Sequence, residues 1–92
     1  MALLDLLGRR WALRLVWELR EEPLVFRALQ QRCGNASASV INDRLRELRG
    51  AGIVGHGSDG YRLTPEGERL LDAYVPLNDW AERWAARSPT ER

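Results

Sequence analysis

Residues 50–60 contain five of the eight glycines in this chain, and they separate two segments whose apolar residues recur with helical spacing. Gly50 and Gly52 are expected to end the first of these helices, because glycine readily adopts the left-handed conformation that closes many helices. A strand is then expected to begin at Ile53, and the stretch 55–60 is typical of a hairpin loop. The chain is therefore predicted to contain one short two-stranded hairpin, about residues 53–63.

A long first helix is predicted over residues 2–20. Leu15 and Leu19 lie on one stripe at i, i+4 spacing, and Leu13 and Trp17 form a second pair on another face. A surface helix needs only one apolar face. We therefore expect the second face to be covered by another subunit or by the C-terminal helix.

Two shorter helices are predicted next, with a tight turn between them. The first covers residues 25–32, after Pro23 has ended the preceding helix. Gly34 and Asn35 suit a turn, because both accept positive φ. The second short helix covers about residues 37–49, with Ser37 as its N-cap. Two such helices followed by a hairpin are typical of a winged helix-turn-helix.

The last helix is predicted over residues 65–86. Thr64 provides a capping hydroxyl and Pro65 suits the first helical position. The polar tail, residues 87–92, is predicted to be disordered. The fold class is therefore mainly α with a small two-stranded β-wing, forming a single winged helix-turn-helix domain over residues 1–86.

Composition limits the class of protein. A chain of 92 residues is long enough for one domain, and a hydrophobic fraction of 45% with four tryptophans suggests a partner surface. The net charge of +1 does not itself indicate nucleic acid. All 14 basic residues are arginine, which suits phosphate and guanine but also fits the codon bias of a GC-rich genome. With one cysteine and no signal peptide or membrane span, we expect a cytoplasmic protein.

Taken in order, these segments resemble the HxlR-type regulators, relatives of the MarR group. The resemblance implies a winged-helix dimer that binds promoter DNA, usually as a repressor and sometimes as an activator. Its N- and C-terminal helices would then be dimerisation helices. The matching segments are Gly8–Trp11, Pro23–Leu29, Ser37 with Ile41 and Arg44–Leu48, Gly52–Val54, Tyr61–Gly67, and then Leu70 and Trp80.

Three positions depart from the family pattern. No cysteine precedes the first helix, so the redox sensing of some members does not carry over to that place. Gly55 and His56 stand where a basic residue often follows the first wing strand, which puts minor-groove contact by the wing in doubt. Ala28 stands where the second helix usually has an acidic residue.

The helix at residues 37–49 is the main candidate for DNA contact, because the major groove admits a helix. Asn42 can pair with adenine, and Arg46 with guanine or phosphate. Asp43 repels phosphate, but it can accept from a cytosine amino group or hold an arginine in place. A solvated helix face is the alternative reading. The predicted DNA-binding residues are Ser37, Ala38, Ser39, Asn42, Asp43, Arg46, Arg27, Arg62 and His56.

A second set of apolar residues is predicted to form a dimer interface, where aromatic residues are enriched. The alternative is that they belong to the core of a single chain. The set comprises Leu3, Leu4, Leu7, Leu13, Trp17, Leu77, Trp80 and Trp84.

No arrangement of residues points to an enzyme, and we predict no catalytic site, metal site or cofactor. Cys33 has no second cysteine or nearby histidine, so it is read as a packing residue. The predicted function is a sequence-specific transcriptional regulator that binds double-stranded DNA as a homodimer. The alternative is a winged-helix module for protein interaction or assembly. An unidentified small-molecule effector in the dimer cleft is a third interpretation.

Overall fold

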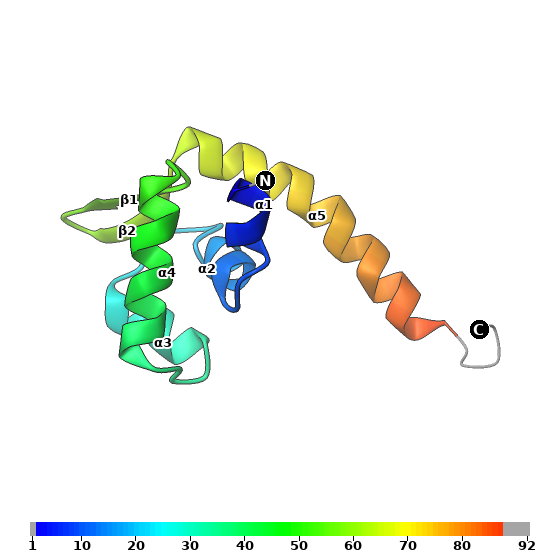
Figure 1. Cartoon of the computed structure of the whole chain (residues 1–92), viewed down its shortest axis with the longest axis horizontal. Coiled ribbons are helices and arrows are strands. Elements are labelled where there is room, and N and C mark those ends of the chain that lie inside the picture. Colours follow the sequence, from blue (N-terminus) through cyan, green and yellow to red (C-terminus); the bar gives the residue numbers. More distant parts are fainter. Residues whose placement is uncertain (1, 88–92) are drawn as a thin grey trace.

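The computed structural model describes residues 2–87, and most of the tail that we expected to be disordered lies outside the described residues. Residues 2–87 form five helices and one hairpin (Figure 1), one helix more than predicted. The elements are α1 (Ala2–Leu7), α2 (Ala12–Glu18), α3 (Phe26–Arg32), α4 (Ala38–Gly50), β1 (Val54–Gly57), β2 (Gly60–Leu63) and α5 (Pro65–Ala86). Within this range, no helix combines the length and apolar composition that crossing a bilayer requires.

The core lies where α2, α3 and α4 meet the hairpin. Its members are apolar, and those from α4 are the residues that the helical spacing predicted. The buried residues of this cluster are Leu15, Val16, Leu19, Leu24, Leu29, Cys33, Ile41, Leu45, Leu48, Ile53, Val54 and Tyr61. The second half of α5 projects away from this core (Figure 1), and the chain measures 50 Å along its longest axis against 27 and 26 Å across.

The single first helix predicted over residues 2–20 is wrong, because the chain breaks between α1 and α2. The amide of Gly8 donates to Leu4 O at 3.0 Å and closes α1. Trp11 then takes a left-handed conformation, with φ of 75°, before α2 begins. Apolar residues on both sides of this turn keep helical spacing, so periodicity alone does not reveal it. The turn places Trp11 against the core, where a tryptophan ring adds buried apolar area.

The hairpin is longer in its strands and tighter in its turn than predicted. Residues 55–57 belong to β1, which pairs antiparallel with β2 from Val54 opposite Leu63 to Gly57 opposite Gly60. Glycines suggested a loop here, but strand pairing needs only their backbone groups. Gly60 has a φ of 115°, and a Cβ there would come within 2.5 Å of Leu24 O.

Leu24 extends the sheet by one isolated bridge. Its amide donates to Tyr61 O at 3.0 Å, and the amide of Tyr61 donates back to Leu24 O at 2.8 Å. The wing is therefore tied to the chain segment between α2 and α3, and its second strand is held close to the hairpin turn by backbone bonds.

The start of α5 confirms the predicted cap. Thr64 Oγ1 accepts from the amide of Gly67 at 3.0 Å and donates to Gly52 O at 2.5 Å. A Cβ at Gly67 would lie 2.2 Å from Ile53 O, so only glycine permits this approach of helix and strand. Thr64 and Gly67 together fix the direction in which α5 leaves the wing.

Candidate nucleic-acid interface

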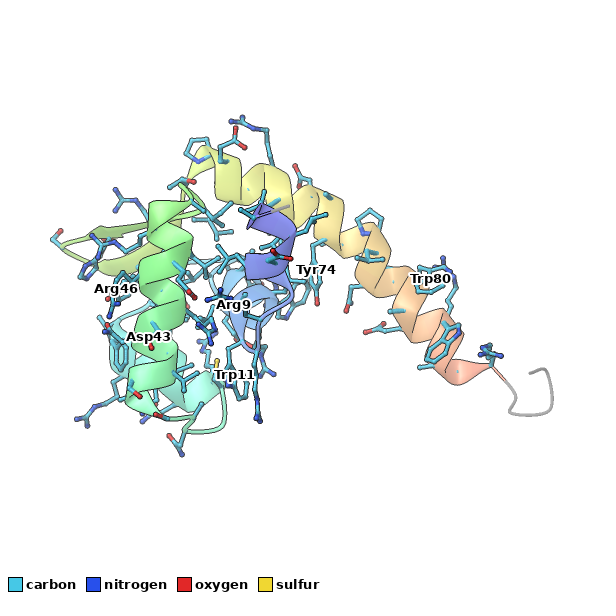
Figure 2. All side chains as sticks on the ribbon, in the orientation of Figure 1. Arg9, Trp11, Asp43, Arg46, Tyr74 and Trp80 are labelled. Carbon is cyan, nitrogen blue, oxygen red and sulfur yellow. The ribbon has the colours of Figure 1, made fainter. Side chains whose placement is uncertain are left out.

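Helix α4 has one buried and one exposed face. Ile41, Leu45 and Leu48 are at most 1% exposed, so the other side of the helix must face outward. The residues predicted on α4 and at its start for DNA contact are all exposed: Ser37, Ala38, Ser39, Asn42, Asp43 and Arg46. Among residues 2–87, no other helix or strand covers their side of α4, as the labelled Asp43 and Arg46 show (Figure 2).

Arg46 and Asp43 form an exposed ion pair one turn apart on α4. Arg46 Nη2 lies 3.2 Å from Asp43 Oδ1, and the two side chains are 70% and 54% exposed. Of the two interpretations of Asp43, this geometry favours the one in which the carboxylate holds an arginine in place. The pair limits the rotamers of Arg46 without burying its guanidinium.

Ser37 lies at the N-cap position of α4, but its side chain does not accept a hydrogen bond from the helix. Its Oγ instead lies 3.1 Å from Ser39 Oγ, so the predicted N-cap position of Ser37 is confirmed but the hydroxyl makes no capping hydrogen bond. Both hydroxyls remain exposed at the helix start, where backbone N–H groups and the helix dipole favour an anion.

The inner side of α4 is anchored by a network that the sequence did not reveal. Arg44 Nη1 donates to Glu47 Oε1 at 2.6 Å, and Arg44 Nε donates to Arg10 O at 3.0 Å. Glu47 also accepts from Arg9, which belongs to the turn between α1 and α2. Arg9, through its guanidinium, and Arg10, through its carbonyl, therefore help to hold α4 in position.

A second ion network joins α2 to α3. Arg14 Nε donates to Glu18 Oε2 at 2.6 Å, and Arg14 Nη2 donates to Arg32 O at 2.7 Å. Arg32 Nη1 lies 3.5 Å from Glu18 Oε1, so this arginine already has a carboxylate partner. Arg27 is exposed and makes no ion pair within residues 2–87, which leaves it available for a phosphate.

The wing carries Arg62 and His56 on its strands. Arg62 Nη1 lies 3.7 Å from Asp59 Oδ1 at the hairpin turn, and both side chains are more than half exposed. His56 stacks on Tyr61, with ring centroids 4.1 Å apart and planes 3° from parallel. His56 is exposed while Tyr61 is buried, so the stack holds the imidazole on the outer side of the hairpin.

The apolar residues predicted for a dimer interface divide into two groups. Trp17 is half-buried and meets Tyr74 of α5 edge-on, with centroids 6.3 Å apart. The C-terminal helix of the same chain therefore contacts this part of the second face of α2. Leu7 and Leu13 are also half-buried. Five other members have large exposed fractions: Leu3 45%, Leu4 60%, Leu77 58%, Trp80 54% and Trp84 54%.

Cys33 lies in the core and is 2% exposed, as predicted for a packing residue. Burial raises the pKa of the Cys33 thiol, against a smaller lowering by the charge of Arg14. The thiol is therefore kept in its less nucleophilic, protonated form.

The three-helix core, the two-stranded wing and the uncovered polar face of α4 define a winged helix-turn-helix protein of the DNA-binding transcription regulator class. The HxlR-like helix-turn-helix family matches residues 6–89, and the chain belongs to that family.

Individual relatives agree with this assignment. The chain is 28% identical to the uncharacterised HTH-type transcriptional regulator YvaP of Bacillus subtilis strain 168, over 87% of this chain and 81% of YvaP. Quinone-bound YodB from B. subtilis superposes with a TM-score of 0.82 at 27% identity, over 89% of this chain and 93% of YodB. A regulator described as MarR family from Enterococcus faecalis V583 superposes with a TM-score of 0.79 at 31% identity, over 89% of this chain and 81% of that regulator.

Proposed function

We propose that this protein is a homodimeric repressor that binds an inverted-repeat operator and inserts one α4 helix per subunit into the major groove. The observation that carries the proposal is the exposed polar face of α4, opposite a fully buried apolar face. A helix with this division can lie in the groove without exposing the core. The protein would repress by occupying promoter DNA.

Within this face, Arg46 and Asn42 are the proposed base-reading residues. Both are exposed on α4, and their side chains can each make two hydrogen bonds to a base edge, to guanine and adenine respectively. Ser37 and Ser39 at the helix start, with Arg27 of α3, are proposed to contact phosphates and set the register. Arg62 and His56 would place the wing beside the backbone.

The second copy is proposed to pack against α1 and the projecting half of α5. Trp80, Trp84 and Leu77 are each more than half exposed, on the half of α5 that projects away from the core (Figure 1). Large apolar side chains exposed together on one helix often mark a protein-interaction site. In a two-fold dimer each arm would cover the other subunit, so the interface would be self-complementary.

The experiment that tests DNA reading by α4 compares Arg46→Ala with Arg69→Ala. Arg69 is also exposed and also pairs with an acidic residue three positions away, but it lies on α5. Fluorescence anisotropy with a selected duplex should show that Arg46→Ala weakens binding by about 1–3 kcal/mol, the range for one base-reading arginine. Arg69→Ala should leave the affinity unchanged. Equal affinities for wild type and Arg46→Ala would remove Arg46 from the interface.

Salt dependence separates this proposal from the alternative of a protein-interaction module. Binding through several phosphates releases counterions, so the affinity must fall steeply as salt rises. An apolar protein interface has no such dependence. Binding to duplex DNA that is weak, flat with salt and indifferent to sequence would favour the protein-interaction module.

A further inference from the structure

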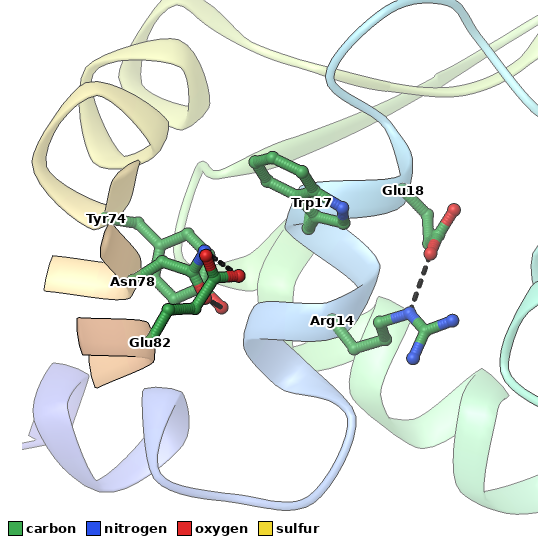
Figure 3. A pocket seen from close by; sticks show the side chains of 6 residues that line it. All are labelled: Arg14, Trp17, Glu18, Tyr74, Asn78 and Glu82. Carbon is green, nitrogen blue, oxygen red and sulfur yellow. Dashed lines mark hydrogen bonds and ion pairs between the residues drawn. The ribbon is translucent and has the colours of Figure 1, made fainter. Parts of the chain in front are cut away.

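A groove of about 300 Å³ lies between α2 and α5 (Figure 3). Tyr74, Asn78 and Glu82 project from α5 toward α2, across a gap from Trp17 (Figure 3). The six residues that line the groove are Arg14, Trp17, Glu18, Tyr74, Asn78 and Glu82.

Two aromatic rings form the apolar part of the groove. Trp17 and Tyr74 meet edge-to-face, with centroids 6.3 Å apart and an interplanar angle of 63°. The Trp17 ring already attracts one cation, because the Arg20 guanidinium lies 3.9 Å from its centroid. Half-buried aromatic rings of this kind suit a flat apolar body and a positive charge beside it.

The two glutamates that line the groove, Glu18 and Glu82, differ in their ion pairs. Arg14 uses its Nε on Glu18 and its Nη2 on Arg32 O, and Glu18 has both Arg14 and Arg32 as cationic partners. On the opposite side, Glu82 interacts only through Asn78 Nδ2 at 3.4 Å, and it makes no ion pair within residues 2–87. The groove therefore offers one carboxylate without a cationic partner beside two aromatic rings.

From this arrangement we infer that the groove binds a small organic cation with a flat apolar body, such as an aromatic ammonium compound. The apolar part would lie against Trp17 and Tyr74. The positive charge would be placed toward Glu82, with Asn78 orienting that carboxylate. A neutral ligand of the same shape would gain only the apolar contact, and an anion would be repelled by Glu82.

Because of the position of the groove, a ligand bound there would change the affinity of the protein for DNA. This consequence rests on the proposed function. The α2 side of the groove connects through Arg14 and Glu18 to Arg32 at the end of α3. The α5 side leads to the arm that carries Trp80 and Trp84. A ligand between them would alter the angle between the DNA-reading unit and the arm, and with it the spacing of the two α4 helices in a dimer.

The test titrates benzyltrimethylammonium into ¹⁵N-labelled full-length protein and follows the indole N–H signals of the four tryptophans. The Trp17 signal should shift in a saturable manner, while the signal of Trp11, which does not line the groove, stays in place. Benzyl alcohol should bind more weakly, and benzoate should cause no saturable shift. A shift caused equally by benzoate, or no saturable shift at Trp17 with the cation, would overturn the inference.

Variants of Glu82 make the test specific to the carboxylate. Glu82 is exposed, so Glu82→Gln should fold normally, and it should weaken binding of the cation about two- to five-fold, as expected for one solvent-exposed charge pair. Glu82→Lys, which reverses the charge, should remove saturation. Glu68→Gln, an exposed glutamate of α5 outside the groove, is the matched control and should bind as wild type does. Equal affinity of wild type and Glu82→Gln would contradict the proposed role of this carboxylate.

Anisotropy of a labelled operator, with and without the cation, separates the two proposals. Cation binding without any sequence-specific DNA binding would leave the groove assignment intact and refute the proposed function. Sequence-specific DNA binding without saturable cation binding would refute only the groove assignment.

Discussion

Glu47 of α4 accepts a hydrogen bond from Arg9, which lies 38 positions earlier in the chain and is labelled in Figure 2. The same carboxylate also binds Arg44 of α4, whose Nε reaches the carbonyl of Arg10. One side chain therefore links α4 to the turn between α1 and α2. The orientation of α4 relative to the N-terminal segment depends on this contact as well as on the apolar core.

Removing this link should cost stability by a small and measurable amount. The Glu47 and Arg9 side chains are 31% and 52% exposed, and partly exposed ion pairs contribute about 0.2–1 kcal/mol. A double-mutant cycle of Arg9→Ala and Glu47→Ala, followed by urea unfolding, should give a coupling energy in that range. If the two substitutions change the free energy of unfolding additively, with no coupling energy, the ion pair does not stabilise the position of α4.

Gly67→Ala should destabilise the protein strongly. Its new Cβ would lie 2.2 Å from Ile53 O, so α5 or the first wing strand must shift; overpacking of this kind costs about 1–3 kcal/mol. Gly50→Ala is the matched control, because it lies at the end of α4 with nothing within 4 Å of the added Cβ. It should be neutral or stabilise by up to about 1 kcal/mol. Urea denaturation checks both, and similar stabilities would contradict the close approach at Gly67.

Asp43→Ala should raise affinity for DNA in general and lower discrimination between sequences. The substitution removes a negative charge from the DNA-facing side of α4 and releases Arg46 from its partner at 3.2 Å. A freed guanidinium can reach phosphates in several ways, whereas the held one is limited in its contacts. Fluorescence anisotropy measures the affinities for the operator and for a random duplex, and the ratio of the two affinities gives the discrimination. A ratio that does not fall would show that Asp43 does not orient Arg46.

Trp80→Ala with Trp84→Ala should shift the protein toward monomer in sedimentation experiments. Both rings are 54% exposed on the projecting half of α5, and buried aromatic residues at interfaces commonly contribute 2 kcal/mol or more each. Asp72→Ala, at an exposed site earlier in α5, should leave the oligomeric state unchanged. Wild-type protein that sediments as a monomer at micromolar concentration would refute the proposed interface.

The sequence predicted those parts of the fold that depend on local signals. The Thr64 cap and Pro65 marked the start of α5, and the spacing of Ile41, Leu45 and Leu48 identified the buried face of α4. These features are visible because capping and amphipathic spacing act within one or two turns of helix. The ordered set of motifs then indicated the wing and the helix-turn-helix order.

Features that depend on contacts between distant segments were missed. The break before α2 requires a left-handed backbone conformation at Trp11, and this conformation cannot be predicted from the residue type. The link of Arg9 to Glu47 and the role of Arg44 join residues more than 30 positions apart, so no spacing rule reveals them. The strands at Gly55 and Gly57 were assigned to a loop because glycine disfavours strands, but here the pairing with β2 outweighs that preference.

The most direct test of the central claim is selection of bound duplexes from a randomised pool, at low and at physiological salt, followed by anisotropy on the enriched site. The account predicts an inverted repeat with half-sites about one helical turn of DNA apart, and an affinity that falls steeply with salt. Inserting half a helical turn between the half-sites should reduce binding to that of a single half-site. Enrichment of an isolated half-site, or of no sequence at all, would contradict a dimer that reads DNA through α4.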